Sequence, residues 1–570
     1  MTRRVVHVSL CLALIVSVLL SACSKKDDGA AAGSPSASAS AGASIKPSSS
    51  AAASPAPVVI DPFAKHNPPI AISTVRRIDA SMKLPAGQTY EDNVWTKALA
   101  SELGINVNVT WTADGSQYDN KLNVTIASGA LPDLMRVNAA QLKQLIESNS
   151  LEDLTDVFNK YASPDTKKQY AVGDSIALKS AQVGGKLYAI PNTASAIAGA
   201  ASPLVWVRSD WMKKLNLQPP KTMQDLLTIA RAFTNNDPDG NGKKDTVGYA
   251  FTNNFLESGL GNLGFFNGYH AYPSIWVKDK TGKLVYGSTQ PEMKKALQDL
   301  QQLYKDGAID QEFTVKDGAK VIDMITAGQV GILTSAHYFG QFTHKLKVRD
   351  PNAEWTPYPL LSIDSEPAKV GLKSPALEYY VVRKGYKNPE AIVQMFNFYY
   401  KMTVGKDATQ EAYDRFMYDK SDGSIQLWKF SPVSTNDATD EPFMQMVDAF
   451  DTKDPNKAVA MDAKTIYGNA MKAQAGENSL FGWTLYYPAW KIIKDVMDKK
   501  LTLNTAFYGA PTATMTDKNA TLLKLEYETF TKIIMGAAPI EEFDKFVENW
   551  SKLGGDQITG EVNAWSKTQN

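Results

Sequence analysis

The sequence predicts an α/β protein of two lobes, and three observations lead to this fold class. Residues 58–570 form a body far longer than the ~250 to 300 residues at which a single hydrophobic core stops growing, so two lobes are expected. Strand-like and helix-like segments alternate along this body, which is typical of α/β architecture. The chain contains 2 cysteines and one of them, Cys11, lies in an apolar N-terminal segment, so core packing without a disulfide must hold the body together.

Residues 1–23 are predicted to be an export signal. A positively charged start precedes an apolar run from Val8 to Leu20, which is too short to remain as a membrane-spanning helix. The run ends in Leu20-Ser21-Ala22-Cys23, which resembles the lipobox of bacterial lipoproteins. In that motif the cysteine carries a diacylglycerol and becomes the first residue after cleavage, so the resemblance implies a lipid on Cys23. An ordinary secretory signal with an incidental cysteine is the alternative.

Residues 24–57 are expected to form a disordered tether. From Gly29 to Pro57 the chain consists mainly of Ala, Ser, Gly and Pro, and Lys46 is its only charge, so there is almost nothing to bury. A flexible segment of about 35 residues has a typical end-to-end span of ~30 Å, which would let the body stand off a membrane and reorient. A disordered binding segment is the alternative, but the aromatic and charged anchors of such segments are absent.

Within the body, apolar periodicity predicts individual elements. Residues 105–111 alternate between apolar and polar side chains, which indicates a strand. The clearest helix covers 223–233, where Thr222 can cap the start and Asp225 lies in the first turn. Further helices are expected over 117–127, 139–146, 291–306, 389–399, 522–535 and 539–553, and a strand over 246–251.

The overall charge argues against nucleic acid as a partner. The chain has 60 basic and 60 acidic residues, and a net charge of zero gives no general field that would attract a polyanion. With 44% hydrophobic and 21% charged residues, the composition is that of a globular protein. After Leu20 the sequence has no second apolar run long enough to span a bilayer.

The segment NDPDGNGKKDTVGY, Asn236–Tyr249, carries most of an EF-hand calcium pattern. Oxygen-bearing side chains recur at alternate positions, Gly242 permits the sharp bend, and hard oxygen donors favour calcium over zinc or copper. Gly248, however, stands where the pattern has a bidentate glutamate. A structural calcium ion is expected, and a hydrogen-bonded Asx-rich turn without an ion is the alternative. The expected ligands are Asp237, Asp239, Asn241, the carbonyl group of Lys243, and Asp245.

The usual signatures of catalysis are missing from the body. Its histidines do not form HExxH or another close pair, and neither a G-x-S-x-G elbow nor a phosphate-binding loop is present. Glycoside hydrolysis stays open, because two carboxylates that folding brings together leave no linear signature.

Aromatic residues are abundant, with 11 Trp and 24 Tyr, and many lie beside Gly, Pro or Asn where loops are expected. Flat rings with polar tips suit sugar faces, whose C–H groups stack while their hydroxyls find polar partners. For any single ring, packing in the core is the alternative. Such clusters occur at 264–270, 336–340, 481–487 and 507–509.

Several segments together resemble the extracellular solute-binding proteins of carbohydrate ABC importers (family 1), in particular the large lipoproteins of Gram-positive bacteria. The likeness covers essentially the whole body. The segments that carry it are TIASGALPD at 125–133, GKLYAIP at 185–191, WVRSDW at 206–211 with KKL at 213–215, the acidic loop after its helix, YGAPT at 508–512, and the closing region 543–557.

This resemblance implies a type II periplasmic-binding-protein-like fold, in which a hinge of three crossings joins two lobes around a ligand cleft. It places lobe 1 at 58–180 and 381–430, and lobe 2 at 181–380 and 431–570. The crossings are expected near 176–182, 378–380 and 428–432. Ligand that contacts both lobes would stabilise the closed state, and the closed state would suit the permease.

The resemblance also implies candidate ligand-binding residues. The segment after Gly185-Lys186-Leu187 follows the cleft in this family, and the segment around His337 resembles the place where the family sets a ring beneath a sugar. Ala130 stands where relatives often have a carboxylate, which puts a hydroxyl contact there in doubt. The candidates are Asn192, Trp206, His337, Tyr338, Tyr379, Trp483, Tyr508 and Asp133.

The function that these observations favour is capture of a carbohydrate, expected to be an oligosaccharide, and its delivery to an ABC permease. The protein would be a monomer, held by the lipid on Cys23 at the outer face of the cell membrane of a Gram-positive bacterium, with no enzymatic activity. A peptide-binding or sensory protein, or a carbohydrate-active surface enzyme, are the alternatives.

Overall fold

The computed structural model describes most of the body. The described residues are 60–78, 84–171, 175–193, 203–257, 259–374, 376–404, 408–417, 419, 425–435 and 440–569. The chain divides into two compact units between Val58 and Val59, and the fold described below is that of the second. The predicted signal, tether and lipidated Cys23 lie outside the described residues.

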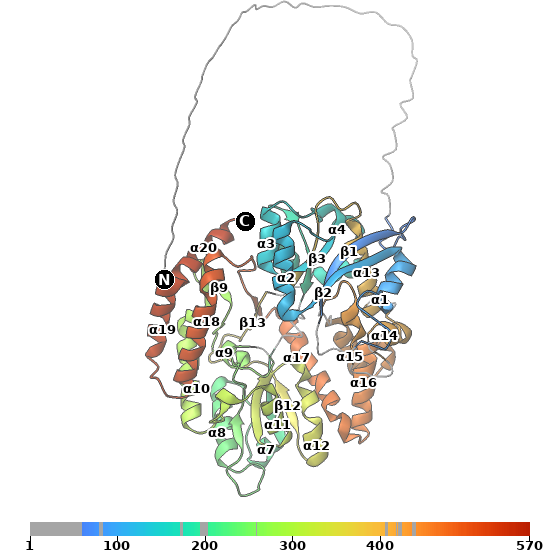
Figure 1. The fold of residues 1–570 in the computed structure, drawn as a ribbon. Coiled ribbons are helices and arrows are strands. Elements are labelled where there is room, and N and C mark those ends of the chain that lie inside the picture. Colours follow the sequence, from blue (N-terminus) through green and yellow to red (C-terminus); the bar gives the residue numbers. More distant parts are fainter. Residues whose placement is uncertain are drawn as a thin grey trace, which may run out of the picture. The chain divides into compact units, whose positions relative to one another are not determined.

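A five-stranded sheet forms the centre of lobe 1, with the order β2-β1-β3-β14-β6. Strand β1 runs parallel to both β2 and β3, whereas β14 is antiparallel to β3 and β6. Figure 1 shows β1, β2 and β3 in blue to cyan beside α2 and α3. The strands are β1 (Ile70–Ile78), β2 (Ile105–Asp114), β3 (Leu134–Val137), β6 (Ile190–Thr193) and β14 (Ala376–Val382).

Helices bury this sheet in one hydrophobic core. Ile72 of β1, Met135 of β3 and Val381 of β14 are fully buried against helical residues such as Phe396. The helices are α1 (Val94–Ala98), α2 (Gly115–Ser128), α3 (Ala139–Glu147), α4 (Thr155–Tyr161), α5 (Pro164–Tyr170), α6 (Ile176–Ser180), α13 (Glu390–Thr403) and α14 (Gln410–Phe416).

A four-stranded sheet forms the centre of lobe 2, with the order β12-β7-β11-β8. Alternate side chains of β7 enter two different cores, as strand geometry requires: Val205 and Val207 pack in one cluster, while Leu204 and Trp206 pack in the other. The strands are β7 (Leu204–Arg208), β8 (Val247–Tyr249), β11 (Val330–Ser335) and β12 (Trp355–Tyr358).

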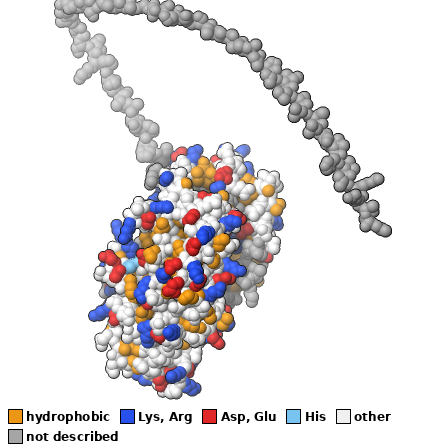
Figure 2. Space-filling model, turned by 90° about the vertical axis from the view of Figure 1, so that its left-hand side faces the viewer, with side chains coloured by type: hydrophobic (Ala, Val, Ile, Leu, Met, Phe, Trp, Pro, Cys, Tyr) orange, Lys and Arg blue, Asp and Glu red, His pale blue; other side chains and the backbone are white. Residues whose placement is uncertain are grey.

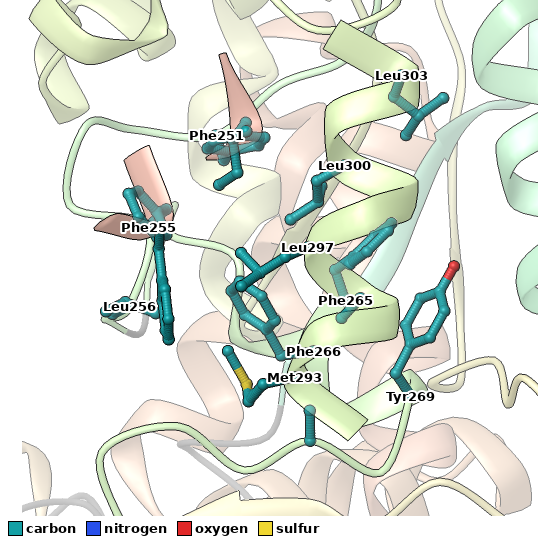
Figure 3. Packing of buried hydrophobic residues seen from close by; sticks show 14 of the residues in the cluster. Phe251, Phe255, Leu256, Phe265, Phe266, Tyr269, Met293, Leu297, Leu300 and Leu303 are labelled. Atoms are coloured by element: carbon teal, nitrogen blue, oxygen red, sulfur yellow. The ribbon is translucent and has the colours of Figure 1, made fainter. Parts of the chain in front are cut away.

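The larger core of lobe 2 is rich in aromatic rings. Figure 3 shows Met293, Leu297 and Leu300 of α10 facing Phe265 and Phe266 of α9. The helices of lobe 2 are α7 (Ser209–Lys214), α8 (Met223–Asn235), α9 (Leu263–Gly268), α10 (Pro291–Lys305), α11 (Gly318–Thr326), α12 (His344–Arg349), α15 (Asp440–Thr452), α16 (Met461–Gln474), α17 (Tyr486–Asp498), α18 (Ala513–Ile534), α19 (Glu542–Trp550) and α20 (Asp556–Lys567).

Short elements complete the fold. Three two-stranded sheets pair β4 with β5, β9 with β10, and β13 with β15. The strands are β4 (Gln182–Val183), β5 (Lys186–Leu187), β9 (Trp276–Lys278), β10 (Leu284–Tyr286), β13 (Val370–Leu372) and β15 (Thr502–Asn504). The short helices are η1 (Leu99–Leu103), η3 (Gly287–Thr289), η4 (Phe313–Val315), η5 (His337–Phe342), η6 (Leu427–Phe430), η7 (Pro455–Lys457), η8 (Asn478–Leu485) and η9 (Ser551–Gly555).

The predicted elements are present, with two corrections near the C-terminus. The helix expected over 522–535 is the second half of α18, which begins at Ala513. The helix expected over 539–553 covers α19 but ends at Trp550, and the chain continues through η9 into α20. Gly554 has a φ of 133°, which breaks the helical path without ending the helical region.

Strand pairing bears on where the lobes meet. Residues 190–193 and 376–380 pair with the first sheet, and 176–180 form α6 of lobe 1. The chain therefore leaves lobe 1 after Thr193, later than the first crossing expected at 176–182, and re-enters it at Ala376. The division of the body at 180/181 and 380/381 stays a prediction, and these pairings favour boundaries near 193 and 375.

Candidate functional site

One edge of the first sheet faces the crossings to lobe 2. Strands β1, β3 and β6 all end at this edge, and β14 begins there, because β14 is antiparallel to β3 and β6. The chain crosses between the lobes after β6 and before β14. In open α/β sheets, ligands bind outside the carboxyl ends of the strands. We call this the hinge-facing edge of lobe 1.

Charged side chains gather at this edge. The two oxygens of the Glu378 carboxylate accept from different arginines: Oε1 from Nη1 of Arg77 at 3.0 Å, and Oε2 from Nε of Arg136 at 2.5 Å. Burial opposes the charge on Arg136, but Tyr380 and Glu378 outweigh burial and raise its pKa. One carboxylate thus holds two guanidinium groups.

Arg76 lies beside them and is buried. Its guanidinium donates to the carbonyl oxygens of Phe430 at 3.2 Å and Lys429 at 3.4 Å, and burial lowers its pKa. These bonds hold η6 against the sheet. A polar cavity of about 30 Å³ opens here, lined by Thr74, Val75, Arg76, Arg77, Arg136, Tyr380, Lys429, Pro432 and Ser434.

Lobe 2 presents His337 and Tyr338 at its own hinge-facing edge. Strand β11 ends at Ser335, opposite Leu204 where β7 begins, and η5 follows directly. His337 is only 6% exposed, and burial lowers its pKa to about 3. It is therefore neutral at physiological pH. Its ring lies against three aromatic rings, with centroid distances of 4.9 Å to Phe443, 5.0 Å to Trp490 and 5.5 Å to Tyr486.

Tyr338 differs from its neighbour because its side chain remains partly exposed. Its ring meets His337 and Phe342 edge to face, at centroid distances of 5.6 and 6.2 Å, and burial raises its pKa. Trp483, another sequence candidate, is also partly exposed and stacks on Tyr486 at 5.3 Å, so it extends the same aromatic cluster. The structure thus brings His337, Tyr338 and Trp483 into one neighbourhood.

Tyr379 and Tyr508 both line a separate pocket of about 480 Å³, whose walls come from both lobes. Lobe 1 contributes α3, the end of α6 and Tyr379, whose hydroxyl lies 3.0 Å from Oγ of Ser180. Lobe 2 contributes residues 507–513 and α20, where Tyr508 contacts Trp565 edge to face at 4.8 Å. A more polar pocket of about 830 Å³ shares Tyr508 and Trp565 with it. Volumes of this order suit a small ligand.

Two further candidates, Trp206 and Asn192, are almost completely buried, which limits their direct contact with a ligand. Trp206 is fully buried in lobe 2, donates to the carbonyl of Ser335 at 3.0 Å, and packs on Phe339. Asn192 is 1% exposed but lies opposite Glu378 at the hinge-facing edge, and its Oδ1 has no partner among the described residues.

Asp133 lies at the start of β3, at the opposite end of the strand from the hinge-facing edge. It accepts from the backbone N–H and the hydroxyl of Ser73, at 2.9 and 2.6 Å, and from Arg383 at 2.6 Å. Burial opposes its ionisation, yet these hydrogen bonds prevail and lower its pKa. Its contacts join β1 to the end of β14, which is a structural role.

In the acidic loop after α8, the side chain of Asn241 forms hydrogen bonds with the neighbouring aspartates. Nδ2 of Asn241 donates to Asp239 at 2.7 Å and to the two oxygens of Asp245 at 3.1 and 3.3 Å. Asp237 accepts from the backbone N–H of Gly242 at 3.0 Å, and Gly242 has the positive φ, 74°, that the bend requires. For Lys243 the structure gives a backbone N–H donated to Asn241. These side chains carry hard oxygen donors, the type that calcium prefers, but as placed here the carboxylates of the loop do not form a group that could hold a metal ion.

Two further findings concern the described residues as a whole. In these ranges, no group of three or more His, Cys, Asp and Glu side chains has an arrangement that could hold a metal ion. None of the helices placed there combines the length and apolar character needed to cross a membrane.

Sequence reasoning missed the charged residues of the hinge-facing edge. Arg76 and Arg77 follow a run of strand residues, and Arg136 stands in the short buried strand LMRV. Charge at the carboxyl end of an apolar strand is a usable signal, because ligands bind at that end. Glu378 has no such signal, since only folding brings it to arginines 301 and 242 residues away.

Two α/β lobes joined by strand crossings, with an interlobe pocket and polar and aromatic residues at the facing edges, define a two-lobed binding protein. The chain belongs to the bacterial extracellular solute-binding protein family, whose family model matches residues 83–406. Its two-domain fold is that of the periplasmic solute-binding proteins.

Among curated relatives, lipoprotein LipO of Bacillus subtilis is 24% identical over 485 residues, which cover 82% of this chain and 87% of LipO. The polygalacturonan/rhamnogalacturonan-binding protein YtcQ of the same organism is 26% identical over 261 residues, covering 45% and 48%. The fructooligosaccharide ABC transporter substrate-binding protein FusA of Streptococcus pneumoniae is 29% identical over 227 residues, covering 38% and 41%. The crystal structure of FusA with kestose aligns over 88% of this chain and 99% of FusA, with a TM-score of 0.56 and 16% identity.

Proposed function

We propose that this protein captures an oligosaccharide between its two lobes and delivers it to an ABC permease. The observation that carries the proposal is the pocket of about 480 Å³ whose walls come from both lobes and include Tyr379, Tyr508 and Trp565. Flat aromatic rings beside polar groups suit sugar faces. The names of YtcQ and FusA, which describe binders of polysaccharide or oligosaccharide, support the same class of ligand.

The pocket and the charged edge lie close together along the chain, and an extended ligand that contacts both would pass over the end of the sheet, because successive side chains of β14 point to opposite faces. Arg136 and Ala139, which lines the pocket, are three residues apart, so the chain between them spans at most ~11 Å. Glu378 and Tyr379 are adjacent in β14. We assign stacking to Tyr508, Trp565 and the partly exposed Tyr338, and hydroxyl recognition to the edge that holds Glu378 and Asn192. The buried Trp206 supports this surface from the core.

Closure explains how binding would lead to transport. A ligand that touches both lobes stabilises the closed arrangement in proportion to its preference for that arrangement. A permease that docks only on the closed form would then receive loaded protein. In this proposal the protein's chemistry is recognition of the ligand alone.

The anchor and location form a further part of the proposal. A lipid on Cys23 and a flexible tether over residues 24–57 would hold a monomeric body at the outer face of the cell membrane. The relative LipO, which is named a lipoprotein, supports this arrangement. Mass spectrometry of protein purified from membranes tests it: a diacylglycerol on an N-terminal Cys23 is expected, and an unmodified or uncleaved chain would contradict it.

We further propose a structural calcium ion in the loop after α8, held by Asp237, Asp239, Asp245, the side chain of Asn241 and the carbonyl of Lys243. Bound there, the ion would neutralise the carboxylates and stiffen the link between α8 and β8. The donor chemistry of the loop supports it, and a crystal structure of a FusA EF-hand mutant exists among the similar folds. Ligand affinity should depend little on the ion, because these residues line neither interlobe pocket.

Thermal unfolding with and without a chelator tests the calcium proposal. Saturating calcium is expected to stabilise the protein by ~2 to 3 kcal/mol, the value for a ligand at 100 times its Kd. Asp237→Asn should abolish this dependence. Asp279→Asn is the matched control, because Asp279 accepts backbone N–H groups in a similar turn that lacks the calcium pattern. Equal melting temperatures with and without calcium would contradict the proposal.

The proposed function is tested by a glycan panel. Differential scanning fluorimetry should reveal at least one oligosaccharide that raises the melting temperature, and calorimetry should give one binding site per chain. If peptides stabilise the protein and no glycan does, the proposal fails. Chromatography of the recovered glycan provides a second test, since shortened products would identify an enzyme.

A further inference from the structure

The hinge-facing edge of lobe 1 carries more positive than negative charge. Three guanidinium groups, those of Arg76, Arg77 and Arg136, lie there with the ammonium-bearing Lys429 around one small polar cavity. Among the described residues, Glu378 is the only carboxylate that forms an ion pair with any of these four cations. One carboxylate leaves this edge with a local surplus of positive charge, although the whole chain is neutral.

Neighbouring carboxylates are engaged elsewhere. Asp114 ends β2 beside β1, and its carboxylate accepts the backbone N–H of Gln117 at the start of α2. Asp133 is held by Ser73 and Arg383 at the other end of β3. Hydrogen bonds leave both carboxylates charged, so Asp114, which lies opposite Ile78 beside this edge, offsets part of the surplus, but four cationic side chains still outnumber Glu378 and Asp114.

The arginines retain hydrogen-bonding capacity. A guanidinium has five N–H donors in a planar fork that matches a carboxylate. The bonds to Glu378 use Nη1 of Arg77, and Nε and Nη2 of Arg136. The Arg77 side chain is 38% exposed and that of Arg136 is 28% exposed, so further donors can reach a ligand.

We propose that the ligand is an anionic oligosaccharide containing uronic-acid units, and that Arg77 and Arg136 bind a uronate carboxylate beside Glu378. This inference rests on the proposed function and narrows its ligand class. Arg76 and Lys429 add positive potential at this edge without contacting the ligand. The guanidinium of Arg76 is already bound to backbone carbonyls.

The physical reason is the cost of leaving this charge uncompensated when the lobes close. Closure removes water from the edge, and a surplus cation without a counter-charge loses hydration that a neutral sugar restores only in part. A carboxylate replaces the lost water with charge-assisted hydrogen bonds. An anionic sugar is also drawn to the edge from solution, which makes its binding sensitive to salt.

Calorimetry with two matched ligands tests the inference. The probes are tetragalacturonate and its methyl ester, which share every ring and linkage and differ in the carboxylate charge. Tetragalacturonate is expected to bind at least ~10-fold more tightly, as hydrogen bonds to charged groups imply. Its affinity should fall with added salt, while that of the ester stays constant.

Variants locate the effect. Arg77→Gln should weaken tetragalacturonate by about 10-fold and leave the ester within twofold, and Arg77→Lys should restore only part of the loss because it lacks the fork. Arg231→Gln is the matched control. Arg231 is likewise partly exposed and paired with one carboxylate, Asp306 at 2.6 Å, but it lies in α8 of lobe 2.

The outcomes separate the two proposals. If the ester binds as tightly as the acid, or a neutral glycan alone binds, the uronate inference is overturned while oligosaccharide capture stands. Failure of every glycan, charged or neutral, overturns both. If Arg77→Gln and Arg231→Gln lose the same affinity for tetragalacturonate, the charge effect does not depend on this edge, which would contradict the assignment.

Discussion

His337 and Tyr338 are adjacent in sequence, but their environments give them different roles. His337 is enclosed by Phe443, Tyr486 and Trp490, and its low pKa keeps it uncharged. Tyr338 keeps part of its ring exposed. The resemblance nominated both residues together, as one segment. It could not tell which ring faces outward, because that depends on helices α15 and α17, about 100 residues or more later in the chain.

Two alanine variants test the stacking residues. Tyr508→Ala and Tyr338→Ala should each lower oligosaccharide affinity by up to about 10-fold, since a lost aromatic contact costs ~0.5 to 1.5 kcal/mol. Calorimetry measures the loss.

The phenylalanine variants at these positions are the controls and should bind within a few-fold of the parent, because the ring remains. Full affinity in either alanine variant would remove that tyrosine from the binding surface.

Glu526 is a buried acid that sequence patterns did not reveal. It lies fully buried in α18, accepts the hydroxyl of Tyr286 at 3.0 Å, and has no partner for Oε1 among the described residues. Burial raises its pKa to about 7 from the ordinary value of 4.5. Between these two pH values, the unfolded chain loses the proton that the folded chain keeps, so folding stability contributed by this group falls as pH rises.

Glu526→Gln tests this titration. A shift from 4.5 to about 7 corresponds to roughly 3 kcal/mol. We expect the stability of the parent relative to Glu526→Gln to decrease by up to that amount from pH 4.5 to 7, and to stay constant above pH 7.

Urea unfolding at several pH values measures the difference, and subtraction cancels groups such as His337 that both proteins share. A difference independent of pH would show that Glu526 titrates normally.

At the scale of elements, amphipathic helices with clear ends were the most predictable part of the fold. Helix α8 shows why: Leu226, Ile229 and Phe233 recur at helical spacing and are buried, and Thr222 and Asp225 form the capping box that their spacing predicts. Both signals are local, so the sequence contains them. The helix α20 was missed because Gly554-Gly555 normally ends a helix, whereas here η9 passes through that pair.

The cap of α8 provides a test of this local logic. Thr222→Ala should lower the free energy of unfolding by about 1 kcal/mol, because the backbone N–H of Asp225 loses its acceptor. Denaturant unfolding measures it. Thr222→Ser, which keeps the hydroxyl, should remain within a few tenths of a kcal/mol of the parent. A loss just as large in the serine variant would assign the effect to the threonine methyl group.

Strand pairing was less predictable than helix position. The strands β3 and β6 have only four residues each, which is too short for a periodic signal. Their partner β14 lies about 180 residues or more further along the chain. Long-range pairing of this kind bears on the hinge, and it favours a first crossing after Thr193 over the predicted 176–182.

At the scale of the whole molecule, the neutral net charge concealed a local asymmetry. On the face shown in Figure 2, acidic and basic side chains are interspersed, as expected for a neutral globular surface. The charged edge became visible only when β1, β3 and β14 were assembled. Composition argued only against nucleic acid as a partner, whereas the fold brought Arg77, Arg136 and Glu378 together.

Closure of two lobes over an oligosaccharide is the central claim, and small-angle X-ray scattering with and without ligand tests it most directly. Saturating oligosaccharide, identified by the glycan panel, is expected to reduce the radius of gyration. Tyr508→Ala at the same ligand concentration should show a smaller reduction. An unchanged radius of gyration for the parent protein at proven saturation would contradict closure.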